Sequence, residues 1–146
     1  MGMWDFVKDA GKKLFGKDDE PEKTEAAITK EMKDLGLDAQ DVDVKVDGDT
    51  VKIKGKTASQ EMREKIILAT GNILGVSKVE EDLEVSDDSK EAEFYTVEKG
   101  DTLSGIAKKT MGNANKYMAI FEANKPMLSD PDKIYPGQKL RIPAEA

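Results

Sequence analysis

Hydrophobic residues recur along the chain with two periods, and the changes between them mark the predicted elements. At the N-terminus the spacing is helical, and it predicts a short amphipathic helix whose apolar face comprises Met3, Val7, Ala10 and Leu14. A second helical stretch runs from about residue 24 to residue 35, and Gly36 stands where a helix usually ends. The chain is therefore expected to begin with two helices.

Valine and isoleucine then alternate with charged residues, which is the pattern of half-buried strands. Residues 42–46 and 51–53 predict a hairpin around Asp47-Gly48-Asp49, and a further helix leads to Gly71. Residues 79–85 predict a third strand against this hairpin. The order α-β-β-α-β predicts a small antiparallel or mixed sheet with helices on one face.

A second unit follows a short acidic stretch that has no apolar period. Residues 94–97 and 139–142 predict two strands, and two helices with apolar faces lie between them. Such a β-α-α-β unit is small enough for its two strands to pair. We therefore predict an α+β fold of two small domains. The predicted parts are an N-terminal helix and connection at 1–23, a first domain at 24–86, a linker at 87–93 and a second domain at 94–146.

The composition excludes several classes of function but does not identify one. The chain has 146 residues and contains neither Cys nor His, which argues against disulfides, zinc sites and thiol chemistry. A net charge of −7 argues against nucleic acid as a partner, since phosphate binding needs clustered Lys and Arg. No apolar run reaches the roughly 18 residues of a membrane span, and the acidic N-terminus does not resemble a signal peptide. We expect a cytoplasmic monomer without an integral membrane segment.

Acidic residues do not assemble into a catalytic or calcium-binding pattern. The pairs Glu80-Glu81 and Asp87-Asp88 do not suit acid–base work, because neighbours in a strand point to opposite faces and linker acids are solvated. The Asp47-Gly48-Asp49 turn fails as a calcium loop, since Lys45 and Lys54 stand where ligands are needed. We read it as a solvated turn and expect no enzyme activity.

The stretch from Gly71 to Val76 is the candidate site that the residues themselves suggest. It ends a predicted helix, whose last carbonyls lack intrahelical donors and carry the negative end of the helix dipole. A cation at this position and an ordinary glycine cap both fit the pattern.

Family resemblances decide between these readings. The second unit resembles a LysM domain through Tyr95-Thr96-Val97, Gly100-Asp101-Thr102-Leu103, Asn124 and Ile134-Tyr135-Pro136-Gly137-Gln138. The region from about Thr24 to Ser86 resembles a BON domain, most clearly at Gly71 and Gly75-Val76. A BON domain followed directly by a LysM domain, behind an N-terminal Trp-Asp-Phe-Val-Lys-Asp-Ala-Gly run, is similar to a family of small cytoplasmic potassium-binding proteins of enterobacteria and relatives.

The resemblance implies that K⁺ is the bound cofactor and that main-chain carbonyls hold it near the junction of the two domains. The residues it implies are Val7, Ala10, Gly71, Ile73 and Val76, with Gly75 close by. Neutral carbonyls can replace the hydration shell of a large monovalent ion. The leading hypothesis is a K⁺ sensor or buffer in which the ion ties the first helix to the Gly71–Val76 stretch and orders the domain arrangement.

Two other functions stay open at this stage. LysM domains generally bind N-acetylglucosamine polymers, so peptidoglycan fragments are an alternative partner. The resemblance places that groove at Asp101, Thr102, Leu103, Asn124 and Ile134. The other alternative is association of the BON domain with a membrane surface through the aromatic residues Trp4 and Phe6.

Overall fold

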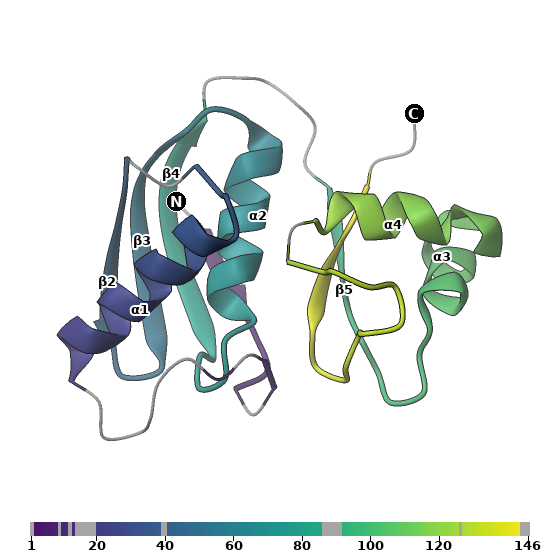
Figure 1. Ribbon diagram of the computed structural model, residues 1–146, viewed down its shortest axis with the longest axis horizontal. Coiled ribbons are helices and arrows are strands. Elements are labelled where there is room, and N and C mark those ends of the chain that lie inside the picture. Colours follow the sequence, from purple (N-terminus) through teal and green to yellow (C-terminus); the bar gives the residue numbers. More distant parts are fainter. Residues whose placement is uncertain are drawn as a thin grey trace.

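The chain forms two α+β domains that lie side by side, with helix α2 (Gln60–Gly71) of the first domain facing the small sheet of the second (Figure 1). The computed structural model describes residues 2–8, 10–11, 13, 20–38, 41–85, 92–125 and 127–143. Most of the predicted linker, at 87–91, lies outside the described residues. The two predicted domain types are both recognisable by their element order.

A mixed four-stranded sheet is the base of the first domain, with the strand order β1-β4-β3-β2. Strands β2 (Val42–Asp47) and β3 (Thr50–Thr57) form the predicted hairpin, and β4 (Lys78–Val85) lies parallel to β3. A parallel neighbour needs a crossover, and helix α2 (Gln60–Gly71) supplies it. The crossover brings the turn after α2 to the same end of the sheet as the β2–β3 turn.

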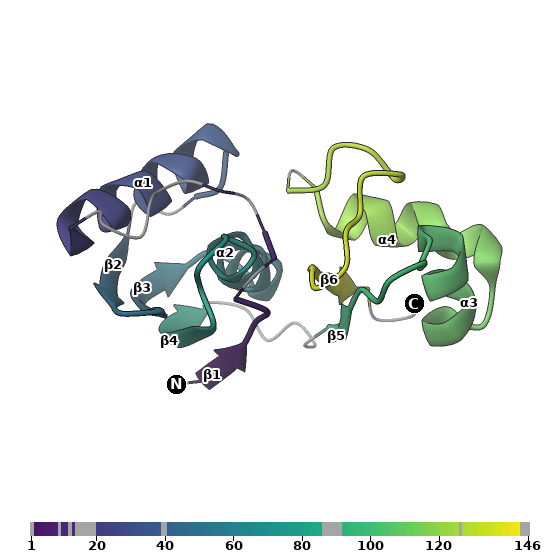
Figure 2. The same ribbon diagram turned by 90° about the horizontal axis from the view of Figure 1, so that it is seen from below.

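Two helices cover one face of this sheet (Figure 2). Helix α1 (Pro21–Asp34) buries Ile28 and Met32, and α2 buries a longer apolar stretch that includes Ile66 and Ile67. The side chain of Ser59 caps α2 by accepting a hydrogen bond from the Met62 amide at 3.1 Å. The α1 helix begins three residues earlier than residue 24, because Pro21 fits the first helical turn, where no amide donor is needed.

The predicted N-terminal helix is wrong over the residues described. Gly2–Asp5 form strand β1, which pairs antiparallel with β4 so that Trp4 lies opposite Val79. The sequence from Met3 to Val7 also alternates with period two: Trp4 and Phe6 are half-buried, and Met3 and Val7 are exposed. The otherwise unpaired edge of β4 favours the strand, because pairing satisfies its amides and carbonyls. Leu14, the last residue of the predicted helix, lies outside the described residues.

The second domain follows the predicted β-α-α-β order. Strands β5 (Glu93–Thr96) and β6 (Lys139–Ile142) pair antiparallel, and the helices between them are α3 (Leu103–Met111), the 3-10 helix η1 (Ala114–Lys116) and α4 (Tyr117–Ala123). Leu103, Ile106, Ile120 and Leu140 are fully or almost fully buried in its core. Gly112 ends α3 in the left-handed conformation with a φ of 75°, which explains why glycine stands there.

Candidate functional site

At the C-terminal end of α2, the hydrogen-bonding capacity and partial negative charge of the main-chain carbonyls are only partly satisfied. The Asn72 amide closes the helix by donating to the Leu68 carbonyl at 2.9 Å, and no basic residue lies in the last turn. In a continued helix the Gly75 amide would donate to the Gly71 carbonyl. It donates instead to the carbonyl of Lys8 at 2.8 Å. The negative end of the helix dipole therefore faces a place where a cation is favoured.

Residues 6–8, 10 and 11, which we call the N-terminal segment, cross this helix end. We call residues 72–77 the junction turn. The Phe6 amide donates to the Ser77 carbonyl at 2.8 Å, so the segment is bonded to the turn at both Phe6 and Lys8. Gly11 has a φ of 117° and lies directly on the Asn72–Ile73 peptide, where a Cβ would overlap the Asn72 carbonyl. Glycine at position 11 thus permits a close main-chain approach.

The junction turn directs two of its carbonyls toward the N-terminal segment. The amides of Ser77 and Lys78 both point at the Asp49 carbonyl, at 2.9 and 3.4 Å. Since N–H and C=O of a trans peptide point in opposite directions, the carbonyls of Val76 and Ser77 lie on the other side, where Phe6 is bonded. The Ser77 carbonyl takes the Phe6 amide, and the Val76 carbonyl lies next to it along the chain.

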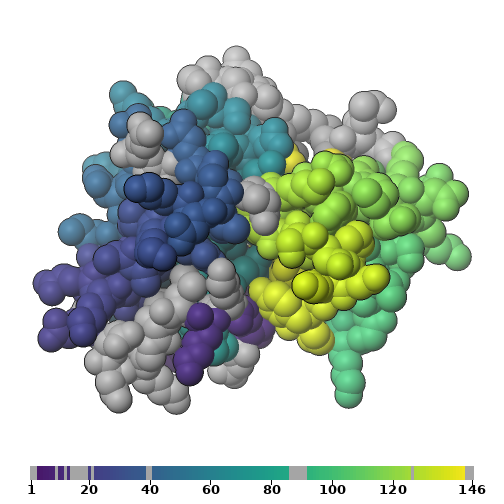
Figure 3. All heavy atoms as spheres, viewed as in Figure 1, coloured from purple at the N-terminus to yellow at the C-terminus, as the bar shows by residue number. Residues whose placement is uncertain are grey.

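The second domain closes over the other side of the N-terminal segment. A Cβ built on Gly137 would lie 2.7 Å from the Ala10 Cβ and 3.2 Å from the Val7 Cβ. Trp4 packs edge to face on Phe94 with ring centroids 4.6 Å apart. In Figure 3 the purple atoms of the N-terminal residues lie against the yellow atoms of the C-terminal strand region. The segment is therefore held between the two domains.

Lys139 of β6 links the second domain to the same segment. Its ammonium donates to the Asp5 carbonyl at 2.8 Å and lies 4.9 and 5.7 Å from the ring centres of Phe6 and Trp4. Burial lowers the pKa of Lys139, although the charge of Asp5 opposes this effect. Its main chain is bonded to the Asn72 side chain, which donates to the Lys139 carbonyl at 2.8 Å and accepts from its amide at 2.9 Å. The residue that caps α2 thus also pairs with the free side of β6.

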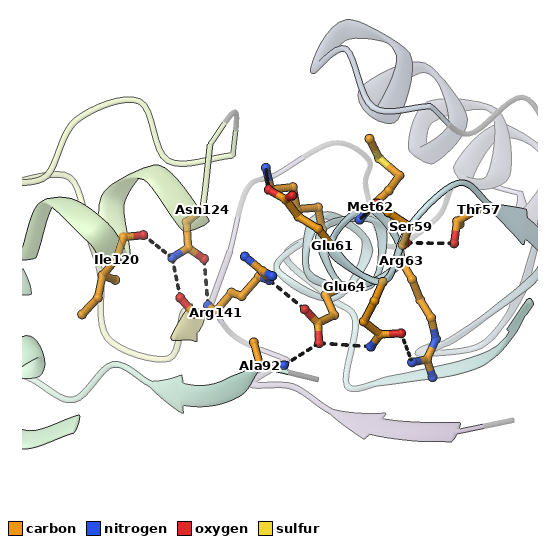
Figure 4. Close-up of polar contacts among 12 residues, drawn as sticks. Thr57, Ser59, Glu61, Met62, Arg63, Glu64, Ala92, Ile120, Asn124 and Arg141 are labelled. Carbon is orange, nitrogen blue, oxygen red and sulfur yellow. Dashed lines mark hydrogen bonds and ion pairs between the residues drawn. The ribbon is translucent and has the colours of Figure 1, made fainter. Parts of the chain in front are cut away.

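A buried carboxylate fixes the domains at a second place (Figure 4). Glu64 of α2 is fully buried and accepts hydrogen bonds from Arg141 Nε at 2.7 Å, the Ala92 amide at 2.9 Å and Gln60 at 3.1 Å. Arg141 belongs to β6, and Ala92 precedes β5. The charge of Glu64 is therefore neutralised by the other domain, and its burial depends on domain contact.

A cleft with a volume of about 270 Å³ lies between the domains. Leu35 of α1 and Leu68 of α2 form one side, and Met127 and Tyr135 from the loop between α4 and β6 lie on the other. Burial raises the pKa of the Tyr135 phenol to about 12. The cleft shares Asn72 and Ile73 with the junction turn.

The structure brings together the two groups of residues that the sequence suggested for an ion. Val7 and Ala10 lie in the N-terminal segment, Gly71 ends α2, and the remaining three, Ile73, Gly75 and Val76, lie in the junction turn. The Val7 and Ile73 carbonyls accept single turn bonds, from Ala10 at 3.2 Å and from Val76 at 3.1 Å. Among the described residues no donor is bonded to the carbonyls of Ala10, Gly71, Gly75 or Val76. Because a carbonyl has two lone pairs, each of these six oxygens keeps an acceptor position that no described residue fills.

Asp49 is a charged neighbour that the sequence reasoning missed. Its carbonyl bonds the junction turn, and its carboxylate lies 3.8 Å from the Lys8 ammonium. Hydrogen bonding from the Ser77 side chain lowers the pKa of Asp49 most; desolvation opposes this effect, and the charge of Lys8 lowers the pKa further. The local pattern showed only an acidic turn. The proximity follows from the parallel β3–β4 pair, which places this turn beside the end of α2.

Most of the residues suggested for a glycan groove serve the second domain itself. Asp101 accepts hydrogen bonds from the Tyr95 hydroxyl at 2.6 Å and the Glu98 amide at 2.9 Å, and these bonds lower its pKa. Thr102 caps α3 by accepting from Gly105, and Leu103 is buried. The two others are Asn124, buried and bonded through its side chain to Ile120 and to both main-chain groups of Arg141, and Ile134, which packs on the domain core. Asp101, Thr102, Leu103 and Asn124 therefore contribute to the stability of the second domain.

The aromatic residues suggested for a membrane surface are also engaged inside the protein. Trp4 packs on Phe94, and the Phe6 ring fills the space that a Cβ of Gly71 would take. Among the described residues, no helix is long and apolar enough to cross a membrane. Among the described N-terminal residues, the large hydrophobic side chains that are exposed are Met3 and Val7.

Comparison with known proteins matches both domains and nearly the whole chain. The LysM domain model matches residues 95–143, and the BON domain model matches residues 20–87. The chain is 46% identical over 153 residues to the potassium binding protein Kbp of Escherichia coli O6:H1, covering 99% of this chain and 100% of that protein. It is 39% identical over 114 residues to an uncharacterized protein of Deinococcus radiodurans, covering 70% of this chain and 44% of that one. The uncharacterized protein YqbP of Bacillus subtilis is 41% identical over 58 residues, which cover 34% of this chain and 26% of YqbP.

Proposed function

Because this chain belongs to the family of the potassium binding protein Kbp, we propose that it binds K⁺ between the N-terminal segment and the junction turn. The observation that carries the proposal is the meeting of these two segments at the end of α2. Several main-chain carbonyls there accept no hydrogen bond from a described residue, and the last turn of α2 has no basic residue. The proposed ligands are the carbonyl oxygens of Val7, Ala10, Gly71, Ile73 and Val76, with Gly75 beside them.

The chemistry of this donor set suits a large monovalent ion. Neutral carbonyl oxygens replace water around K⁺ without requiring a carboxylate in the first shell. Ca²⁺ and Mg²⁺ usually bring carboxylates, and Mg²⁺ also keeps several water molecules. Among the described residues there is no group of three or more acidic side chains placed to hold a metal. The partial negative charge at the α2 terminus adds attraction that does not depend on a side chain.

The ion would act on the domain arrangement because its ligands lie on a segment that touches both domains. Val7 and Ala10 pack on Gly137 of the second domain, and Lys8 is bonded to Gly75 of the first. A ligand that binds only the docked form at a hundred times its dissociation constant stabilises that form by about 2.7 kcal/mol. This is a factor of roughly a hundred in the docking equilibrium, enough for a sensor or buffer of K⁺.

A salt titration tests the proposal. The protein is titrated with KCl and with NaCl, and choline chloride keeps the ionic strength constant. Fluorescence of Trp4, the only tryptophan, reports the contact with Phe94, and thermal unfolding reports stability. We expect a saturable K⁺ response that Na⁺ does not reproduce. Equal responses to the two salts would contradict the proposal.

Two glycine variants locate the site. Gly11→Ala places a methyl group on the Asn72 carbonyl and should weaken K⁺ binding by at least tenfold. Gly36→Ala is the matched control, since Gly36 also has a positive φ, of 79°, but has nothing within 4 Å of its Cβ position. Both variants carry the strain of a left-handed residue, and only the first disturbs the ligands. Equal K⁺ affinities in the two variants would exclude this location.

A further inference from the structure

Asp49, in the turn between β2 and β3, contacts both segments of the proposed site. It lies on the side of the junction turn opposite the Val76 and Ser77 carbonyls and is not among the proposed ligands. Its main-chain oxygen accepts the amides of Ser77 and Lys78, and its carboxylate lies 3.8 Å from the Lys8 ammonium. Ser77 and Lys8 adjoin Val76 and Val7, two of the residues whose carbonyls are proposed to bind the ion.

From this position we infer that Asp49 sets the affinity of the K⁺ site by attracting the ion electrostatically, and that Lys8 opposes it. The inference rests on the proposed function and adds a charged pair to it. Two unit charges separated by several ångströms near a protein surface interact strongly enough to change an equilibrium measurably. The Asp49 and Lys8 side chains are 46% and 57% exposed, so solvent and salt weaken the effect. We therefore expect changes of about threefold to tenfold for each charge removed.

The carboxylate can act without replacing a carbonyl ligand. A carboxylate that coordinated the ion directly would favour small or divalent cations, whereas a charge that does not touch the ion attracts K⁺ and Na⁺ alike. Asp49 should therefore change affinity and leave the ratio of K⁺ to Na⁺ affinity as it is. Hydrogen bonding from Ser77 and the nearby lysines lower the pKa of Asp49, so the negative charge is present at neutral pH.

The test measures K⁺ affinity by isothermal titration calorimetry for the full-length chain and four variants. Asp49→Asn keeps the shape of the side chain and should bind K⁺ about threefold to tenfold more weakly, with Asp49→Glu restoring most of the loss. Lys8→Met should bind it more tightly by a similar factor, and the main-chain bond from Gly75 to Lys8 is retained. Asp47→Asn is the control, because it removes an exposed carboxylate from the end of β2, two residues from Asp49, and should change affinity less than twofold.

Two further measurements distinguish an electrostatic effect of Asp49 from a structural one. The difference in K⁺ affinity between Asp49→Asn and the wild type should shrink in about 0.5 M choline chloride, because salt screens the charge. The ratio of K⁺ to Na⁺ affinity should stay unchanged. The inference is overturned if Asp49→Asn binds as Asp47→Asn does, if Lys8→Met fails to bind more tightly, or if the difference persists in high salt. Absence of K⁺ binding by the wild type would instead refute the proposed function, so the two failures are distinguishable.

Discussion

Replacing Gly71 by alanine tests whether the N-terminal segment packs on the end of α2. A Cβ at this position would overlap the ring of Phe6, which is half-buried between Gly71 and Lys139. Gly71 is the last residue of the helix, where alanine is intrinsically preferred over glycine by up to about 1 kcal/mol. An isolated helix would thus gain stability from this substitution, whereas the packed one should lose it.

The magnitude follows from the displaced ring. Removing a fully buried phenylalanine costs about 3–5 kcal/mol, so expelling the half-buried Phe6 ring should cost about 2 kcal/mol. After the helix gain, Gly71→Ala should be less stable than the wild type by about 1–2 kcal/mol. In a Phe6→Ala background the methyl group has room, and the same substitution should be neutral or stabilising by about 0.5 kcal/mol. The coupling between the two residues is then about 2 kcal/mol, well above the limit for independent sites.

Urea unfolding of the four proteins of this cycle measures the coupling. Trp4 fluorescence follows β1, which leads into the N-terminal segment, and far-ultraviolet circular dichroism follows the helices. Additive effects within about 0.5 kcal/mol would show that Phe6 does not lie on Gly71 in solution, and the site geometry would lose its basis.

Three other predictions address the domain junction. Gly137→Ala should destabilise the protein by about 1–2 kcal/mol more than Gly100→Ala, because both glycines have a φ of 89° and only Gly137 meets the N-terminal segment, as urea unfolding will show. Glu64→Gln should cost about 2–4 kcal/mol of docking free energy, since Arg141 loses its buried partner, and should raise the radius of gyration in small-angle scattering. Glu81→Gln is the control: its partner lies within the first domain, so it should not expand the protein. The pKa of Tyr135 is about 12 in the folded protein against an ordinary value of 10.0. Its contribution to the free energy of unfolding is therefore complete below pH 10 and is lost as the pH rises toward 12. Tyr135→Phe should remove this alkaline loss in unfolding experiments between about pH 9 and 12.

The sequence predicted the elements of both domains because each has a local signal. The alternating valines of β2 and β3 and the helical spacing before Gly71 report burial on one face, and the structure confirms these elements. Pro21 is also a local signal for the start of α1, but we placed it in the charged connection that precedes the helix. These features depend on neighbours within a few residues.

The N-terminal strand and the neighbourhood of Asp49 depend on distant parts of the chain. Residues 3–7 satisfy both a helical and an alternating pattern, and the edge of β4, more than seventy residues away, favours the strand. Asp49 comes beside Ser77 only because β3 and β4 are parallel. Glu64 interrupts the apolar face of α2, and the reason is Arg141 of the other domain. No local pattern contains such information.

Diffraction from crystals grown with RbCl tests the central claim most directly. Rb⁺ is close to K⁺ in size and scatters anomalously, so its position can be located without assuming a coordination. The account predicts an anomalous peak between residues 7–10 and 71–76, surrounded by main-chain oxygens and close to Asp49. A peak at a different place in the protein, or none in a chain that binds Rb⁺ in solution, would contradict it.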